Sequence, residues 1–497
     1  MAAKGDRQPR LAAPVTLSVA FHGAAGTVTG SRYLVSSGHS NLLIDCGLFQ
    51  GPRELRELNW LPAPFPPTAP AAVLLTHAHI DHSGWLPRLV KDGFRGPVYC
   101  TPATAEMVRI LLLDAARLQE EDAEYANRKG FSRHRPALPL YTEKDAHRAL
   151  DLLEPIEYRH RKVVAPGITA RFLNAGHILG SAFIELACDT PKGAATLVFS
   201  GDLGRSGVPL HSDPDPLPAC DILVLESTYG DRTHGEEPID RQIEREFRPT
   251  IDQGGVILIP AFAVARAQLV TLILRDLIHA GRLPDIPIHI DSPMASDVTA
   301  LYNRYMRSES LDQHIPHTTP RTLFPRNVRF HRTVQESMQL NDLSGPRIIV
   351  SSSGMLAGGR VLHHLKRLAP HPENLIALVG FQAEGTRGRD LADGKRIVRV
   401  HGQDVKVAAR VATLHGLSAH ADRDELMDWV AAQPSRPRAV YLTHGEPAPR
   451  EAMRAELDRR LNVTGVLPAM NEEHVLEWLF RAPGERPAAP FPSAKVP

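Results

Sequence analysis

Residues 74–84 read LLTHAHIDHSG and place His77, His79, Asp81 and His82 at the end of an apolar run. Folded proteins rarely crowd imidazoles and carboxylates in this way unless a metal ion neutralises them. In an extended chain His77, His79 and Asp81 point to one side, which predicts a strand end followed by a loop. His82 breaks this alternation and requires a turn. The stretch therefore predicts a binuclear metal site, in which the first two histidines serve one ion and Asp81 with His82 the other.

The surrounding sequence argues against the alternative, a set of solvated loop histidines. The cluster follows the apolar residues VLLT directly, and the next stretch, SGWLPRLVKDG, predicts a helix that ends at Gly93. Histidines held between a strand and a helix are better explained as ligands than as surface residues.

The composition is typical of a soluble protein with two or more domains. The chain has 497 residues, of which 43% are hydrophobic and 23% charged. No apolar run is long enough to cross a bilayer, so we expect a cytoplasmic protein without membrane association. The four cysteines form no CxxC pair, which argues against a zinc ribbon or a disulfide framework. With a net charge of +1, any nucleic-acid binding must depend on a local site.

Further candidate ligands follow other apolar strands in the first half of the chain. Asp45 follows NLLI, His177 follows RFLN, Asp202 follows TLVF, and Glu226 ends DILVLE. Ligand sites of layered α/β folds are built at strand ends, so Asp45, His77, Asp202 and Glu226 are expected to converge. For Asp45 alone, a cap of the strand end remains the alternative.

The middle of the chain has a different pattern. From about residue 230 to 400, apolar strands alternate with helices, which predicts a parallel sheet with covering helices. After about residue 400 the earlier pattern resumes and contributes His420 and His444. Because candidate site residues lie on both sides of it, the parallel region is expected to be an insertion into the first domain.

Local signals also predict two helices. Thr101 and Pro102 form an N-cap and first-turn pair for a long helix that runs to about Lys129 and ends at Gly130. The segment NEEHVLEWLF, residues 471–480, is expected to be the last helix.

The motifs, taken in order, resemble those of one protein family. THAHIDH, AGHILGSA, SGDLG, ESTYG, SAHAD and LTHGE are similar to the motif series of the metallo-β-lactamase fold nucleases of the β-CASP family. SSSGM at 351–355 and GFQAEGTRGR at 380–389 resemble signatures of that family's inserted domain. The resemblance covers the chain from about residue 15 to 480. It implies an α/β fold, a metallo-β-lactamase αββα sandwich with an inserted parallel β-CASP domain.

The expected domain boundaries follow from the resemblance and the change of pattern. The metallo-β-lactamase domain would comprise 14–229 and 401–481, and the β-CASP domain 230–400. Residues 1–13 are expected to form a disordered arm, and the proline-rich residues 482–497 a disordered tail.

The resemblance also implies a ligand set for two zinc ions per chain. His77, His79 and His177 would hold one ion, Asp81, His82 and His444 the second, and Asp202 would bridge them. Asp45 would orient a ligand or the bridging water. Nitrogen and oxygen donors suit zinc, and they leave Mn²⁺ and Fe²⁺ open as alternatives.

The implied chemistry is hydrolysis of a phosphodiester bond in RNA. Two metal ions about 3.5–4 Å apart generate a hydroxide at neutral pH and neutralise the developing charge. Asp81 and Asp202 would act in catalysis through the metals. His420 is the candidate general acid for the leaving 3′ oxygen, and Glu226 could orient it. The expected products carry 5′-phosphate and 3′-hydroxyl ends.

The inserted domain would clamp the RNA strand. Ser352, Ser353 and Gly354 follow the strand RIIV just before a helix, and Arg360 and Arg387 lie near them in sequence. Hydroxyl and backbone N–H groups in such a turn can form a phosphate nest. An ordinary strand-to-helix turn explains the serines equally well.

RNA is preferred over DNA because His444 occupies a position where the DNA-repair branch of the family tends to have an apolar residue. The expected partner is single-stranded RNA, with a homodimer left open. Endonuclease activity is favoured and 5′–3′ exonuclease activity is secondary, since the long extra C-terminal domain of ribonuclease J is not evident. The alternatives are a DNA nuclease, a small-molecule hydrolase such as a lactonase or thioesterase, and a non-catalytic RNA-binding scaffold.

Overall fold

The computed structural model describes residues 17–480, except 39, 131, 133, 236, 315–322, 325, 381, 383–384 and 434, together with 493–495. The arm expected over 1–13 lies outside the described residues. So does the tail expected over 482–497, apart from Ser493–Lys495, which forms a short strand. Within the described part of the chain, no helix has the length and hydropathy needed to span a membrane.

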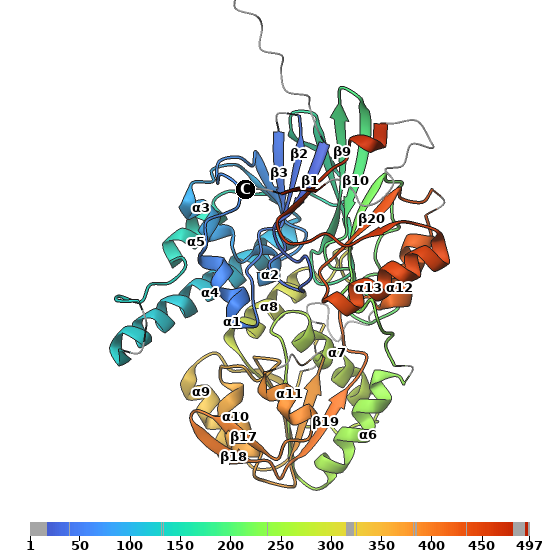
Figure 1. Cartoon of the computed structure of the whole chain (residues 1–497). Helices are drawn as coiled ribbons and strands as arrows, with labels where there is room; N and C mark the ends of the chain where they lie inside the picture. The colour runs from blue at the N-terminus through green and yellow to red at the C-terminus, as the bar shows by residue number, and fades with distance from the viewer. Residues whose placement is uncertain are drawn as a thin grey trace, which may run out of the picture.

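Two mixed β-sheets face each other at the centre of the first domain (Figure 1). In spatial order the eight strands of the first sheet are β23 (Ser493–Lys495), β22 (Glu472–Val475), β1 (Leu17–Phe21), β2 (Tyr33–Ser37), β3 (Ser40–Ile44), β4 (Ala72–Leu74), β5 (Val98–Cys100) and β6 (Leu153–Pro155). The seven strands of the second are β21 (Gly465–Val466), β20 (Ala439–Thr443), β11 (Ile222–Glu226), β10 (Gly193–Phe199), β9 (Ala182–Thr190), β8 (Ile168–Asn174) and β7 (Arg161–Ala165).

The space between the two sheets is a buried aromatic and aliphatic core. The ring of Phe21 on β1 stacks on Tyr441 of β20, with ring centroids 5.4 Å apart. Tyr33 on β2 stacks on Phe199 of β10 at 6.0 Å. Both pairs join one sheet to the other, because strands of the two sheets bury alternate side chains against each other.

Helices cover the outer faces of both sheets, which completes an αββα sandwich (Figure 1). On the side of the first sheet lie α1 (Arg53–Glu57), η1 (Leu58–Trp60), α2 (Ile80–Ser83), α3 (Leu86–Asp92), α4 (Pro102–Lys129) and α5 (Glu143–Leu150). On the side of the second lie α12 (Arg423–Ala431), α13 (Pro447–Glu456) and the π-turn η3 (Leu457–Leu461). The predicted long helix is confirmed: Thr101 caps α4 by accepting the N–H of Thr104, and Gly130 ends it with φ 68°.

A third sheet, whose strand pairs are all parallel among the described residues, forms the inserted domain. Its order is β14 (Val328–Phe330), β13 (Ile288–Asp291), β15 (Arg347–Ser351), β12 (Val256–Pro260), β16 (Leu375–Val379) and β19 (Arg410–Leu414). Its two faces are covered by α6 (Ile239–Asp252), α7 (Arg266–His279), α8 (Pro293–Arg304), α9 (Val334–Gln339), η2 (Leu340–Asp342), α10 (Val361–Leu368) and α11 (Arg387–Ala392). The hairpin of β17 (Ile397–Val400) and β18 (Gln403–Lys406) completes it. The predicted fold class is confirmed.

The path of the chain shows how the insertion is built into the first domain. Strand β20 follows the inserted domain in sequence, yet it pairs in parallel with β11, from Ile222 opposite Ala439 to Glu226 opposite Thr443. The inserted sheet ends only with β19 at Leu414, so it continues past the boundary expected at residue 400. We propose that the inserted domain extends from about residue 230 to 415.

One expected helix is wrong. Residues 472–475 of the segment NEEHVLEWLF form β22, which pairs antiparallel with β1, and the rest forms a short 3₁₀ turn, η4 (Glu477–Phe480). The edge of the first sheet offers unpaired backbone groups at this place, and pairing with them outweighs the local helical preference.

Candidate metal centre

The candidate ligands lie on loops at the carboxyl ends of strands. His77 and His79 follow β4, His177 follows β8, Asp202 follows β10 and His444 follows β20. The turn predicted at His82 starts earlier than expected: α2 begins at Ile80, so Asp81 also lies in the helical turn and not in extended chain.

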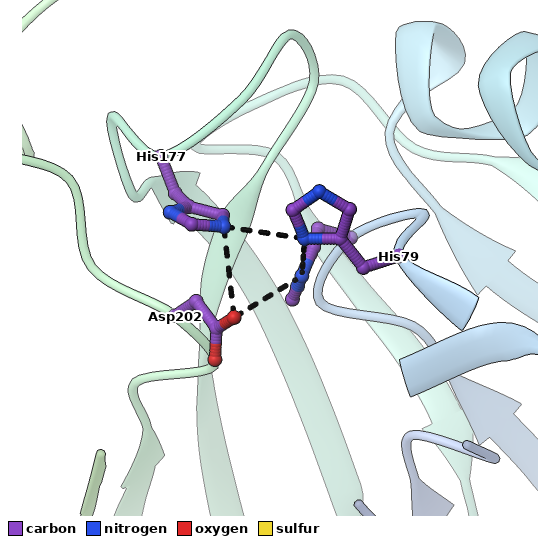
Figure 2. A group of neighbouring side chains, drawn as sticks. His79, His177 and Asp202 are labelled. Atoms are coloured by element: carbon purple, nitrogen blue, oxygen red, sulfur yellow. Dashed lines mark hydrogen bonds and ion pairs between the residues drawn. The ribbon is translucent and has the colours of Figure 1, made fainter. Parts of the chain in front are cut away.

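Three histidines and one carboxylate form the first donor group. Their ligand atoms lie within 4.8 Å of one another, and Figure 2 shows His79, His177 and Asp202 pointing toward a common centre. His79 Nδ1 lies 3.0 Å from His77 Nε2 and 3.3 Å from His177 Nε2. Asp202 Oδ2 lies 3.4 Å from His77 Nε2 and 3.6 Å from His177 Nε2.

Asp81, His82 and His444 form the second donor group. Asp81 Oδ2 lies 3.2 Å from His444 Nε2 and 3.8 Å from His82 Nε2. The other oxygen of Asp202, Oδ1, faces this group, at 3.2 Å from His82 Nε2 and 3.6 Å from His444 Nε2. Asp202 thus presents one carboxylate oxygen to each group.

Oxygen atoms behind the cluster orient the imidazoles. His82 Nδ1 donates to Asp45 Oδ2 at 2.7 Å, and Asp45 also accepts the N–H and hydroxyl of Thr76. His177 Nδ1 donates to the carbonyl of Ala419 at 3.1 Å. Such contacts on the far ring nitrogen fix the tautomer and aim the other nitrogen at a metal. Asp45 thus contacts the far ring nitrogen of His82, and its orienting role stays a prediction.

Two threonines complete this layer, and the sequence reasoning did not identify either. Thr76 Oγ1 lies 3.0 Å from His77 Nδ1, and Thr228 Oγ1 lies 3.0 Å from His444 Nδ1. Both residues stand within motifs, THAHIDH and ESTYG. Their position inside those motifs was the only sequence signal that could have indicated a role beside the histidines.

The charges of the cluster suit a cation. Burial lowers the pKa of His77 and His177 well below the ordinary value and that of His79 to about 4, so these three imidazoles are neutral at pH 7, the form that can bind a metal. Asp202 Oδ1 is buried and accepts no hydrogen bond from the described residues. A buried carboxylate oxygen without a hydrogen-bond donor, amid imidazole nitrogens, fits a divalent metal with nitrogen and oxygen ligands.

His420 and Glu226 lie beside the donor groups. His420 Nδ1 is 3.2 Å from Glu226 Oε2 and 3.9 Å from Asp202 Oδ2. Glu226 is held in turn, because it accepts the N–H of Leu203 and the hydroxyl of Thr228. Burial lowers the pKa of His420, but the carboxylates of Glu226 and Asp202 outweigh it and raise the pKa to about 9.

The centre opens into a cavity of about 360 Å³ between the two domains. The first domain contributes His79, Asp81, His177, Asp202 and His420 to its wall. The inserted domain contributes Met294, Met355 and the consecutive residues 262–266. A substrate in this cavity would contact both domains.

The five residues expected to bind RNA phosphates lie in the inserted domain but do not line this cavity. Ser353 Oγ accepts the N–H of Ala357, and Gly354 packs against Phe262. Ser352 is half-buried.

Both arginines of this set make internal contacts. Arg360 donates to Asp291 Oδ1 at 2.9 Å and to the carbonyl of Arg332 at 2.7 Å. Arg387 donates to the carbonyls of Leu356 and Ala357. Both guanidinium groups are therefore engaged by other groups of the inserted domain.

Comparison with known proteins agrees with this architecture. The profile of the metallo-beta-lactamase superfamily matches residues 25–166, that of the Beta-Casp domain 267–391, and that of the Zn-dependent metallo-hydrolase RNA specificity domain 404–468. A crystal structure of a protein of unknown function from Enterococcus faecalis has the same fold, with a TM-score of 0.53 at 15% identity over 93% of this chain and 100% of that one.

Several curated proteins are similar over most of the chain. A ribonuclease of Thermus thermophilus is 40% identical over 431 residues, which are 85% of this chain and 92% of the ribonuclease. The transcription termination factors FttA of Methanosarcina mazei and Pyrococcus abyssi are 30% and 34% identical over 85% and 76% of this chain. The matches span only 66% and 57% of those two factors.

Fold and site together define a metal-dependent hydrolase with a metallo-β-lactamase sandwich and a β-CASP insertion. The chain belongs to the β-CASP family of metallo-β-lactamase fold enzymes, as its motif series predicted.

Proposed function

We propose that this protein is a zinc-dependent ribonuclease that cuts single-stranded RNA internally and leaves 5′-phosphate and 3′-hydroxyl ends. One observation carries the proposal: the two oxygens of Asp202 face two separate donor groups, and His420 lies beside them in the same cavity. A carboxylate placed between two metal positions suits the two-metal hydrolysis of a phosphodiester.

We assign the ligands as the sequence predicted. One zinc ion would be held by His77, His79 and His177. The second would be held by Asp81, His82 and His444, and Asp202 would contact both ions. When bound, such ions lower the pKa of water and neutralise charge on a phosphate. Mn²⁺ and Fe²⁺ accept the same donors, so elemental analysis of the purified protein is the measurement that distinguishes them.

The chain's own groups would provide the proton for the leaving oxygen. His420 Nδ1 is held by Glu226, which leaves Nε2 without a hydrogen bond to any described residue. A histidinium held in this way can donate from Nε2 to a leaving 3′ oxygen in the cavity. Glu226 is a positioning residue, since it acts through His420.

RNA is preferred as the substrate for two reasons. His444 retains a ligand at the position where the DNA-repair branch tends to have an apolar residue. The similar protein of Thermus thermophilus is named a ribonuclease, and the RNA specificity profile matches the segment that contains His420 and His444. A homodimer and a cytoplasmic location remain proposals, to be tested by light scattering and by cell fractionation.

The substrate assignment is tested with end-labelled single-stranded RNA, single-stranded DNA and duplex DNA side by side, with and without a chelator. We expect chelator-sensitive internal cutting of the RNA and loss of all cutting in Asp81→Ala. Preferential cutting of DNA would contradict the RNA assignment. Zinc-loaded protein that cuts neither polymer would favour a small-molecule hydrolase or a scaffold. A dependence on 5′-phosphate would reveal exonuclease action.

The acid is tested with His420→Ala. We expect kcat to fall by a factor of about 10²–10⁴ while the zinc content stays unchanged, because His420 is not a proposed ligand. His415→Ala is the control, since His415 is exposed on the loop that leads to His420 and should have near-normal activity. Loss of zinc in His420→Ala would mean that this residue is a ligand and not the acid.

A further inference from the structure

The wall of the cavity opposite the metal centre is a short loop of the inserted domain. Residues 261–265 connect β12 to α7, which begins at Arg266, and residues 262–266 all line the cavity that contains His79, Asp81 and His420. Two of them carry side chains suited to a nucleic acid, the aromatic Phe262 and the cation Arg266. Neither was identified from the sequence.

Arg266 is a cation without a partner among the residues that the structure describes. Its guanidinium makes no hydrogen bond or ion pair with any described residue, and its Nη1 atom is fully buried. Burial lowers its pKa to about 10, so it stays charged at neutral pH. Because an unpaired guanidinium is costly to bury, an anion that enters the cavity would be bound strongly by it.

The backbone around Arg266 keeps the guanidinium at the wall. Gly380 lies against it, and a Cβ at that glycine would come 3.3 Å from Cζ of Arg266. The N–H of Arg266 donates to the carbonyl of Val264 at 2.7 Å, across Ala265 with φ 61° and ψ −49°. This is the strained form of the γ-turn, which a chain rarely adopts without a local need.

The side chain of Phe262 is unusually exposed for an aromatic residue, with 40% of its surface accessible to solvent. Gly354 supports it from behind, since a Cβ there would lie 3.0 Å from Cδ2 of the ring. The side chains of Met294 and Met355 line the same wall. An exposed aromatic face beside a cation is the arrangement that binds single-stranded nucleic acids by stacking and charge.

We propose that Phe262 and Arg266 hold one nucleotide of the RNA next to the cutting site, Phe262 by stacking on its base and Arg266 by binding its phosphate. The inference rests on the proposed ribonuclease function and deepens it. A base within a duplex is already stacked and paired, so this pair selects single-stranded RNA. It also explains how the inserted domain can bind phosphate although Arg360 and Arg387 are engaged internally.

The test measures binding of a fluorescein-labelled single-stranded oligoribonucleotide by anisotropy, at several salt concentrations, to zinc-loaded protein in the slow His420→Ala background. Phe262→Ala should weaken binding about tenfold with an unchanged salt slope, because stacking involves no counterions. Phe262→Trp should restore the affinity. Arg266→Gln should weaken binding and reduce the slope of log K against log salt by about 1, while Arg266→Lys should keep the slope.

Matched controls are available in the same domain. Arg329 and Phe330 are exposed neighbours on β14 outside the cavity, and Phe330 has 41% of its surface exposed. Arg329→Gln and Phe330→Ala should leave affinity and slope unchanged. Duplex RNA should bind equally to the parent protein and to Phe262→Ala.

The outcomes separate this inference from the proposed function. If the parent protein binds and cuts RNA but the Phe262 and Arg266 variants bind it as tightly, the inference is overturned and the ribonuclease proposal stands. If Arg266→Gln and Arg266→Lys weaken binding equally with an unchanged slope, Arg266 supports the fold and does not contact phosphate. If the parent neither binds nor cuts RNA, the proposed function itself fails.

Discussion

At the scale of single residues, two glycines allow the loops that carry proposed metal ligands to pack against neighbouring backbone. A Cβ on Gly47 would lie 1.6 Å from the carbonyl oxygen of Asp81, and one on Gly204 would lie 1.9 Å from that of Gly176. In each case a loop that carries a proposed ligand packs on the backbone of its neighbour. Any side chain at these positions must displace the backbone that aims Asp81 or His177.

We therefore expect Gly47→Ala to lose zinc and stability together. The displaced backbone should cost about 3 kcal/mol in the free energy of unfolding, the upper range for overpacking. Urea denaturation and elemental analysis measure the two effects. Gly235→Ala is the control, because a Cβ there would meet nothing within 4 Å and its φ is not positive. Full zinc content in Gly47→Ala would contradict this account of the loop.

The histidines of the centre could be predicted from sequence because ligand chemistry and strand ends are both local signals. Whether a given arginine is free to bind a phosphate could not be predicted in this way. Arg360, at the start of α10, is neutralised by Asp291 on β13, and Arg266 has no partner among the described residues. Only the tertiary structure decides which of the two cations is available, and nothing in their immediate sequences distinguishes them.

At the scale of elements, the start of α12 positions His420. Asp422 caps this helix by accepting the N–H groups of Asp424 and Glu425, and its other oxygen accepts the N–H of His234. The ring of His234 in turn donates to the carbonyl of His420 at 3.0 Å. The helix cap and the candidate acid are therefore connected by two hydrogen bonds.

Asp422→Ala should reduce both stability and cleavage. Loss of the cap should cost about 1–2 kcal/mol, and the loop of His420 should move, so kcat falls while zinc is retained. Thr142→Ala breaks the capping box of α5 in the same domain and should lower stability by a similar amount with normal kcat. Urea denaturation and RNA cleavage assays measure both variants. Equal kcat values in the two would show that α12 does not position His420.

Helices and strands were predicted correctly where local caps and hydrophobic periodicity agreed. The prediction failed where pairing with a strand distant in sequence determined the structure. Thr101 and Gly130 delimit α4 because both signals are local. Residues 472–475 form a strand because β1, at the other end of the chain, offers an edge to pair with. The αββα sandwich and the insertion were predictable from the order of the motifs, whereas the end of the inserted sheet at Leu414 was not.

At the scale of the molecule, the metal centre should stabilise the whole fold. Zinc at about 1,000 times its Kd should add about 4 kcal/mol to the free energy of unfolding, so a chelator should lower Tm. The shift should grow from pH 6 to pH 8, because the ligands bind metal only when deprotonated.

The pKa of His82 in the metal-free protein also predicts that the shift in Tm caused by the chelator grows as pH rises. Asp202 and Asp45 outweigh the effect of burial and raise this pKa well above its ordinary value. The stability that protonated His82 contributes without metal is present below the ordinary histidine pKa and is lost as pH rises through the folded-state value. Scanning calorimetry with and without chelator at both pH values measures the effect. A shift that grew on acidification would contradict it.

The pairing of β20 with β11 has a consequence for protein synthesis. The ribosome makes β11 long before β20, and the whole inserted domain separates them in sequence. A nascent chain therefore carries one complete donor group while the second still lacks His444, which follows β20. The second donor group can close only after His444 has been added, so the proposed centre stays incomplete while the whole inserted domain is being synthesised.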